Sequence, residues 1–185
     1  MIIDLIKNRR AVFPPQFNDE KITKSEITEL LEAANWAPSH FKTEPWWFKV
    51  VHTSKGKEEF SAFISETYKN KAAKFSEIKF KKLKGMPLKS AAVIVICMQR
   101  DEKKRAPEWE EIAAVSMAVQ NLWLQATEMR IGGFWSSPEV IIKEMHHFFE
   151  LKERESCLGF FYLGKYDKEL QKGERGNIQD KISWV

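Results

Sequence analysis

One unbroken apolar run in the middle of the chain limits the possible folds more than any other feature. Residues 91–98 read Ala-Ala-Val-Ile-Val-Ile-Cys-Met, with no polar side chain and an excess of valine and isoleucine. A half-buried strand alternates polar and apolar residues, so an unbroken run indicates a central strand covered on both faces. We therefore expect a sheet flanked by helices.

Two strong helices are predicted around this strand. The pattern Thr23-x-x-Glu26 is a capping box, and apolar residues follow it with helical spacing, so we predict a helix from Lys24 to Trp36. The longest predicted helix runs from Glu108 to Arg130. Apolar residues surround much of its surface, so we expect it to be buried, with Gly132 as its C-terminal cap.

The stretch from Ala33 to Val51 combines a helix end, a polar loop and a strand start. Pro38 disfavours helical dihedrals at the residue before it, and Pro45 precedes an apolar run suited to a strand entering the core. A loop held between a helix end and a strand is a common seat for a flat ligand with polar edges. The alternative is an ordinary connection whose tryptophans fill the core.

Weaker patterns predict the remaining elements. In chain order, we expect a short helix with Ile2, Ile3, Leu5 and Ile6 on one side, a strand over 47–52, a helix capped by Ser54, a loop at Gly85-Met86-Pro87, a helix from Ser137-Pro138 through Phe148, a strand from Leu158 to Gly164, and a docking strand at Ile182 to Val185. The last strand could pair with its own subunit or with another.

Length and composition bound the class of protein. The chain has 185 residues, 43% hydrophobic and 30% charged, which predicts one soluble globular domain covering residues 1–185. No apolar run approaches the roughly 20 residues that cross a bilayer, and no signal peptide is recognisable, so we expect no membrane contact and a cytoplasmic location. Cys97 and Cys157 each lie in apolar runs, so neither a disulfide framework nor a metal cluster is indicated.

The positive charge of the chain is concentrated in one segment. The net charge is +4, yet residues 69–89 alone hold eight lysines against one glutamate. A solvated helix face is the simplest interpretation, while such a patch could also bind a polyanion or attract a phosphorylated dinucleotide to a nearby pocket. Since no nucleic-acid-binding module accompanies the patch, we expect no nucleic-acid partner.

Several ordered motifs together resemble the flavin-dependent nitroreductase family, particularly its small single-domain branch. The motifs are Arg9-Arg10-Ala11 with Phe13, Ala37-Pro38-Ser39-His40, Glu44-Pro45-Trp46-Trp47-Phe48, Val119-Gln120-Asn121-Leu122, Gly132-Gly133-Phe134-Trp135, and the strand from Leu158 to Gly164. Each motif alone is weak, but their order and spacing match the family over nearly the whole chain.

The resemblance implies a fold, a cofactor and an activity. The fold is α+β, a mixed, mostly antiparallel sheet flanked by helices, in an intimate homodimer with exchanged C-terminal arms. The implied cofactor is FMN, with NADH or NADPH as a transient hydride donor and a small molecule such as a nitroaromatic or a quinone as acceptor, in a ping-pong sequence. The flavin N5 carries the hydride, so no catalytic side chain is expected.

The resemblance also assigns the cofactor contacts. It implies that Arg9, Arg10 and the Ala11 N–H serve the phosphate and pyrimidine side, that Trp36 and His40 reach the flavin of the neighbouring subunit, that Trp135, Ser136 and Ser137 border its ring or phosphate, and that Arg175 helps to hold the phosphate. A guanidinium fork suits a phosphate or a planar carbonyl edge.

Three departures and two alternatives accompany this interpretation. Ala11 stands where the family has serine, Glu44 stands where it has glutamine, and residues 69–87 are idiosyncratic. One alternative is a flavin-binding protein without turnover, and another is a basic nucleic-acid-binding domain that uses the lysine patch. We expect no metal, because among His146, His147, Glu144 and Glu150 only His146 and Glu150 share a helix face.

Overall fold

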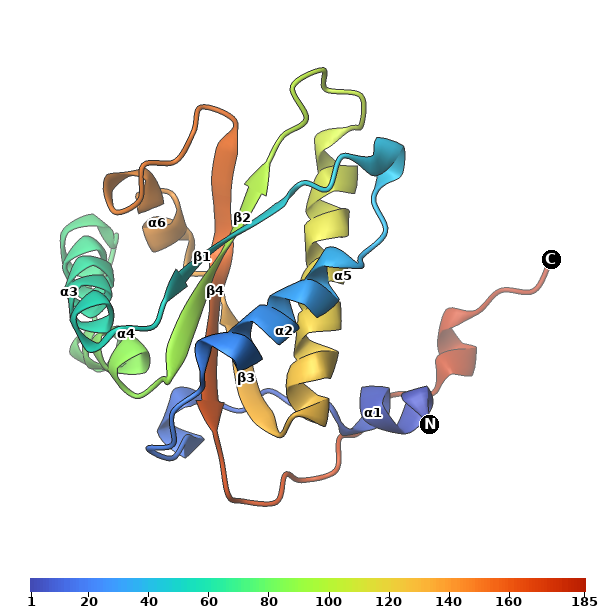
Figure 1. The fold of residues 1–185 in the computed structure, drawn as a ribbon, viewed down its shortest axis with the longest axis horizontal. Helices are drawn as coiled ribbons and strands as arrows, with labels where there is room; N and C mark the ends of the chain where they lie inside the picture. The colour runs from blue at the N-terminus through green and yellow to red at the C-terminus, as the bar shows by residue number, and fades with distance from the viewer.

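The computed structural model describes residues 1–185 and is built on a four-stranded antiparallel sheet with helices on both faces (Figure 1). The strand order is β1-β2-β4-β3, in which β1 is Trp46–Val51, β2 is Ala92–Gln99, β3 is Ile131–Ser136 and β4 is Glu155–Lys165. Residues 92–98 of β2 are each at most 1% exposed. The predicted central strand and the predicted α+β class are therefore confirmed.

Alternate residues of β2 point into two separate cores. Ile94, Ile96 and Met98 pack with α2 (Lys24–Asn35) and α5 (Glu108–Glu128). The odd-numbered residues 93, 95 and 97 pack on the other face, against α3 (Ser54–Lys71), α4 (Glu77–Leu88) and α6 (Glu139–Ile142). This period of two is the geometry of any strand, and here it explains why the run contains no polar residue.

Both ends of α2 follow from the sequence. The Glu26 N–H donates to Thr23 Oγ1 at 3.2 Å, and the Thr23 N–H donates to the Glu26 carboxylate at 2.8 Å. The helix ends at Asn35, three residues before Pro38, and β1 begins directly after Pro45. The predicted capping box, helix end and strand start are confirmed.

Two predictions on the lysine-rich side were wrong. Gly85, Met86 and Pro87 do not form a loop; they are the last turn of α4. Pro87 lies inside this turn although it has no N–H to donate, and the helix ends one residue later at Leu88. The cap of α3 is Thr53 rather than Ser54, since Thr53 Oγ1 accepts the Gly56 N–H at 3.0 Å.

The end of α5 also differs from the prediction. The chain reverses at Arg130, whose φ is +55°, and Gly132 already belongs to β3 rather than capping the helix. Glycine is required there for packing: a Cβ at Gly132 would lie 2.9 Å from the Val12 side chain, and one at Gly133 would lie 2.5 Å from the Phe161 ring. The helix is also less buried than predicted, because Trp109, Ile112 and Met117 are 68%, 39% and 41% exposed.

The segment after β3 forms less helix than predicted. Instead of one helix from Ser137 to Phe148, it contains α6 and a separate 3-10 turn at Met145–His147, and Pro138 occupies the N-cap position of α6. Only Ile141 and Met145 of these two elements are buried. Because packing of an apolar face supplies most of the stability of a helix, two buried residues support only short turns here.

The two chain ends lie outside the sheet. Helix α1 (Ile2–Asn8) has no buried residue, and the tail runs outward past a 3-10 turn at Ile178–Lys181 (Figure 1). The predicted strand at Ile182 to Val185 is wrong for the single chain: these residues are irregular, and Trp184 is 85% exposed. A strand forms only against a partner strand, and no sheet edge of this chain pairs with the tail.

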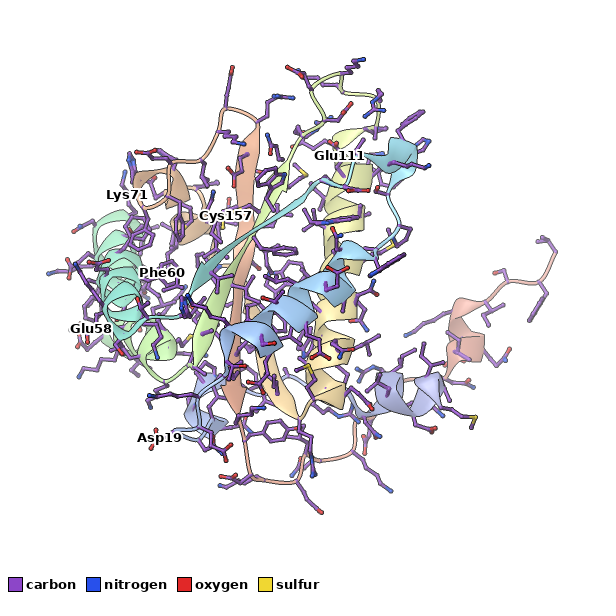
Figure 2. All side chains as sticks on the ribbon, in the orientation of Figure 1. Asp19, Glu58, Phe60, Lys71, Glu111 and Cys157 are labelled. Carbon is purple, nitrogen blue, oxygen red and sulfur yellow. The ribbon has the colours of Figure 1, made fainter.

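The cysteines lie opposite each other in the second core. Cys97 on β2 and Cys157 on β4 are register partners, and both are buried and free. Cys157 is labelled in Figure 2. Separately, none of the helices combines the length with the apolar character that a bilayer crossing requires.

Candidate functional site

Three arginines without an acidic partner gather where α1 meets α5. The Arg9 Cζ lies 4.4 Å from the centroid of the Trp123 ring. Burial, followed by repulsion from Arg175 and from Arg10, lowers the pKa of Arg9. Since none of the three guanidinium groups forms an ion pair, their mutual repulsion is uncompensated. Such an arrangement is suited to binding an anion.

Arg10 differs from Arg9 because its guanidinium is hydrogen-bonded within the chain. Its guanidinium donates to the carbonyl oxygens of Lys7 at 2.6 Å, Arg9 at 2.7 Å and Gln171 at 3.1 Å. Its own carbonyl accepts the Trp123 indole N–H at 3.2 Å. Arg10 therefore ties together α1, the C-terminal segment and α5, which leaves Arg9 and Arg175 with more donors for a ligand.

The backbone after these arginines runs beside β3. Ala11 forms a parallel bridge with Gly133, and the Val12 N–H donates to the Gly133 carbonyl at 3.0 Å. The Ala11 N–H makes no hydrogen bond within the chain. Trp135, Ser136 and Ser137 continue from Gly133 at the end of β3. The structure thus brings the Arg9–Ala11 segment beside Gly133 of β3 and Arg175 near Arg9, whereas Trp135, Ser136 and Ser137 form no hydrogen bond, ion pair or ring contact with the arginines.

The second predicted group surrounds the opposite end of α5. His40 Nδ1 lies 2.5 Å from Glu110 Oε2, and the His40 ring stacks on Phe41 with 3.9 Å between centroids. Trp36, the last residue before the loop, is 80% exposed. Of the tryptophans in this stretch, only Trp46 fills the core.

One chain cannot bring these two groups together. His40 contacts Glu110 in the first turn of α5, whereas Arg9 and Arg10 contact Trp123, thirteen residues further along the helix. At 1.5 Å per residue, the two positions lie about 20 Å apart along the helix axis. Within a single subunit, Trp36 and His40 are therefore separate from the arginine group.

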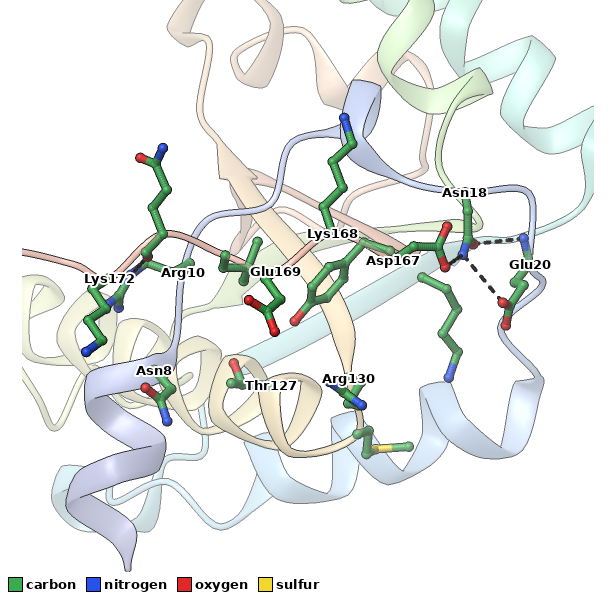
Figure 3. A pocket seen from close by; sticks show the side chains of 15 residues that line it. Asn8, Arg10, Asn18, Glu20, Thr127, Arg130, Asp167, Lys168, Glu169 and Lys172 are labelled. Atoms are coloured by element: carbon green, nitrogen blue, oxygen red, sulfur yellow. Dashed lines mark hydrogen bonds between the residues drawn. The ribbon is translucent and has the colours of Figure 1, made fainter.

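Two hollows accompany these groups. A polar cavity of about 740 Å³ lies beneath residues 165–172 and is lined by Arg10 and by the last residues of α5 and its turn, including Thr127 and Arg130 (Figure 3). A second cavity, of about 410 Å³, lies beside His40 and is lined by Pro38, Ser39, His40, Trp109, Glu110, Ala113, Ala114 and Met117. Only Arg10 and His40 among the predicted contacts line either hollow.

Sequence reasoning missed two residues that organise these groups. Trp123 supports both Arg9 and the Arg10 carbonyl, and the helical pattern had assigned it to the core. Glu110 holds His40, but an acidic first turn of a helix predicts only a favourable helix dipole. A histidine in a loop flanked by prolines could have indicated that a carboxylate lies nearby. The sequence alone does not show which of Glu108, Glu110 and Glu111 is that partner.

Three lysines of the segment 69–89 pair with glutamates, two of which lie outside the segment. Lys69 pairs with Glu66 at 4.0 Å, Lys71 with Glu144 at 3.5 Å and Lys81 with Glu77 at 3.4 Å. Elsewhere, no group of three or more histidine, cysteine, aspartate or glutamate side chains is arranged to hold a metal ion.

Comparison with known proteins decides the family. The family model described as "Nitroreductase family" matches residues 6–165. The chain belongs to the nitroreductase family. This family of oxidoreductases includes "Putative NAD(P)H nitroreductase YfhC" of Bacillus subtilis (strain 168), which is 30% identical to this chain over 181 residues, covering 97% of this chain and 92% of that protein.

Solved structures show the same nitroreductase fold. The "Nitroreductase-like Family Protein from Bacillus cereus" has a TM-score of 0.80 and 27% identity, covering 100% of this chain and 96% of the other. The structure of a "putative nitroreductase in complex with fmn" from Desulfovibrio desulfuricans has a TM-score of 0.77 at 18% identity, covering 100% of this chain and 96% of the other. The family resemblance that the sequence motifs carry is thereby confirmed.

Proposed function

We propose that this protein is an FMN-dependent oxidoreductase that passes hydride from NADH or NADPH to small acceptors such as nitroaromatics or quinones in a ping-pong sequence. The observation that carries the proposal is the group of three arginines that lack acidic partners beside an unpaired backbone N–H. The Desulfovibrio desulfuricans neighbour is a complex with FMN, and the name of the Bacillus subtilis relative includes NAD(P)H. We keep the cytoplasm as the expected compartment.

The residues present fit FMN. We propose that Arg9 and Arg175 bind its phosphate, that Arg10 holds the segment in place, and that the Ala11 N–H donates to the cofactor. Trp135, Ser136 and Ser137 would border the cofactor along β3. When bound, the flavin supplies two-electron redox chemistry, and the protein positions it and covers one face of its ring.

We further propose a homodimer in which two sites are shared between subunits. Trp36, Trp109, Ile112 and Met117 expose apolar surface along and beside α5. An antiparallel pairing of two α5 helices about a twofold axis buries this surface. It also brings the His40 end of one helix beside the Arg9 end of the other, so that Trp36 and His40 complete the neighbour's site. The exposed tail then has a second subunit on which to dock.

The visible spectrum of the purified protein tests the proposal most directly. We expect a flavin spectrum, or its recovery when FMN is added, followed by bleaching on anaerobic addition of NADH or NADPH and return of colour with a quinone. A colourless protein that takes up no FMN would contradict the proposal. Persistent colour after both reductants would instead favour a flavin-binding protein without turnover.

A further inference from the structure

We propose that His40 is the proton donor of the reaction and that Glu110 is its positioning residue. The inference rests on the proposed function, because His40 would act at the flavin site completed by the second subunit. The loop that carries His40, between α2 and β1, lies against the start of α5 (Figure 1). Four observations support this role: a fixed imidazole, a strained loop, an adjoining cavity, and a demand for one proton in each turnover.

The imidazole is held in one orientation. Glu110 Oε2 lies 2.5 Å from His40 Nδ1, and an ionised carboxylate can only accept a hydrogen bond, so Nδ1 carries a hydrogen. Nε2 is then the nitrogen left to exchange a proton with a ligand. The His40 side chain is 56% exposed and that of Glu110 is 24% exposed, so the acidic partner is the more enclosed of the two.

The loop beyond His40 adopts a conformation that ordinary connections avoid. Phe41, Lys42 and Glu44 all have positive φ, at 54°, 52° and 43°, although none is glycine. Each such residue costs on the order of 1–3 kcal/mol and persists only where its surroundings enforce it. Here the Phe41 carbonyl accepts from Arg105 at 3.4 Å, and the Glu44 N–H donates to Ser39 Oγ at 3.2 Å. These two hydrogen bonds therefore hold the strained loop that carries His40.

A cavity gives the imidazole access to a small molecule. Ala113, Ala114 and Met117 of α5 line the 410 Å³ hollow beside His40, which makes one wall apolar. Glu110 is the only other titratable residue in that lining. The remaining charged groups near the ring are Arg105, which reaches the Phe41 carbonyl, and the loop residues Lys42 and Glu44.

The chemistry of the acceptors requires such a donor. Reduction of a quinone by NADH adds two electrons and one hydrogen as hydride, and one further proton completes the hydroquinone. Reduction of a nitro group to a nitroso group likewise takes a hydride and one proton and releases water. In the proposed step the His40 Nε2–H bond breaks, an O–H bond forms on the acceptor oxygen, and the neutral imidazole regains its proton from water.

The test compares two acceptors in matched histidine variants of the FMN-loaded protein. His40→Gln removes the donor, and His147→Gln is the control, because His147 forms a similar surface pair with Glu144 at 3.5 Å with 62% and 22% exposure. Menadione requires a proton, whereas ferricyanide accepts an electron without one. We expect His40→Gln to lower kcat with menadione about 100-fold and to change the ferricyanide rate less than about twofold.

The pH profile provides a second measurement. If His40 donates the proton, the wild-type menadione rate should depend on pH, and the profile of His40→Gln should be flat. Glu110→Gln keeps the shape of the pair and removes the charge, so it should lower the menadione rate by a smaller factor. It also serves as the test variant if His40→Gln fails to fold.

Two results would overturn the inference while leaving the proposed function intact. One is an equal menadione rate in His40→Gln and His147→Gln, together with a wild-type menadione rate that does not vary with pH. The other is an equal loss of both acceptor activities in His40→Gln, which would assign His40 to cofactor binding. Failure of the wild-type protein to bind FMN would instead contradict the proposed function itself.

Discussion

The arginines at the two ends of α5 differ in whether they have acidic partners. At the start of the helix both arginines have acidic partners, since Arg100 pairs with Glu108 and Glu111 and Arg105 pairs with Asp101, and His40 contacts Glu110. Hydrogen bonds from the Arg105 side chain and backbone hold the pKa of Asp101 well below its usual range. At the end of the helix, Arg9, Arg10 and Arg175 gather with no acid among them.

This difference separates a framework from a binding site. Paired charges fix geometry, and at the start of α5 they hold a strained loop in place. Unpaired like charges destabilise the folded chain until an anion joins them, so a bound phosphate should raise the stability of the whole protein. The lesson is that the absence of a carboxylate can identify a site as well as the presence of a functional group.

The largest expected effect lies at the paired end. Glu111 is fully buried, accepts the Asp101 N–H at 2.9 Å and pairs with Arg100 (Figure 2). Glu111→Gln should lower the free energy of unfolding by about 3 kcal/mol, because it leaves a partly buried guanidinium without its main partner. Urea titration measures this loss. Glu108→Gln is the control, since Glu108 pairs with the same arginine from a 61% exposed position; equal losses would show that burial of Glu111 is unimportant.

The next effect lies at the unpaired end and concerns binding rather than stability. Arg9→Ala should weaken FMN binding about 10- to 100-fold, because it removes a partly buried cation that faces the ligand. Arg10→Ala should also lower flavin occupancy, through loss of the tether to Gln171, whereas Lys82→Ala on α4 should not. The flavin-to-protein ratio after dialysis measures all three. Equal occupancy in the three variants would reject the placement of the phosphate.

The smallest effect tests an ion pair near the arginines. Gln125 of α5 donates to Glu29 of α2 at 2.7 Å, so the first turns of α2 lie beside the end of α5. In the same region Lys165 donates to Glu26 at 2.7 Å, and this is the ion pair to be tested. The hydrogen bond from Lys165, then that with the Thr23 backbone, lowers the pKa of Glu26 to about 2. Glu26→Gln should therefore cost about 1 kcal/mol of unfolding free energy at pH 7.

The pH dependence of that loss has a definite sign. The folded pKa lies below the ordinary value, so the stabilisation is complete above about pH 4.5 and disappears as pH falls towards 2. Urea titrations of the wild type and of Glu26→Gln should therefore converge at low pH. A difference that stays constant from pH 7 to pH 2 would show that the charge of Glu26 contributes nothing.

Local chemistry made part of this molecule predictable. The unbroken apolar run, the Thr23–Glu26 capping box and the two prolines around the His40 loop each depend on neighbours in sequence, and each prediction was correct. The errors at Gly132 and Pro87 arose where distant residues decide, since Val12 and Phe17 crowd Gly132 and α4 continues through its proline.

The sequence predicted several residues of the candidate site but not the contacts that hold them. The arginine pair and His40 stand out in the sequence, but Trp123 and Glu110 become visible only once α5 carries one partner at each end. The state of the tail was unpredictable for another reason, because its apolar residues need a surface that the single chain does not supply.

The opposed cysteines give this protein an internal reporter of unfolding. A hydrogen bond to Cys157, followed by burial, raises the pKa of Cys97, and the chain contains no cysteine beyond these two. The native protein should thus be nearly inert to a chromogenic disulfide reagent, whereas each molecule that opens its second core exposes both sulfur atoms. The rate of colour development would then count opening events without any attached label.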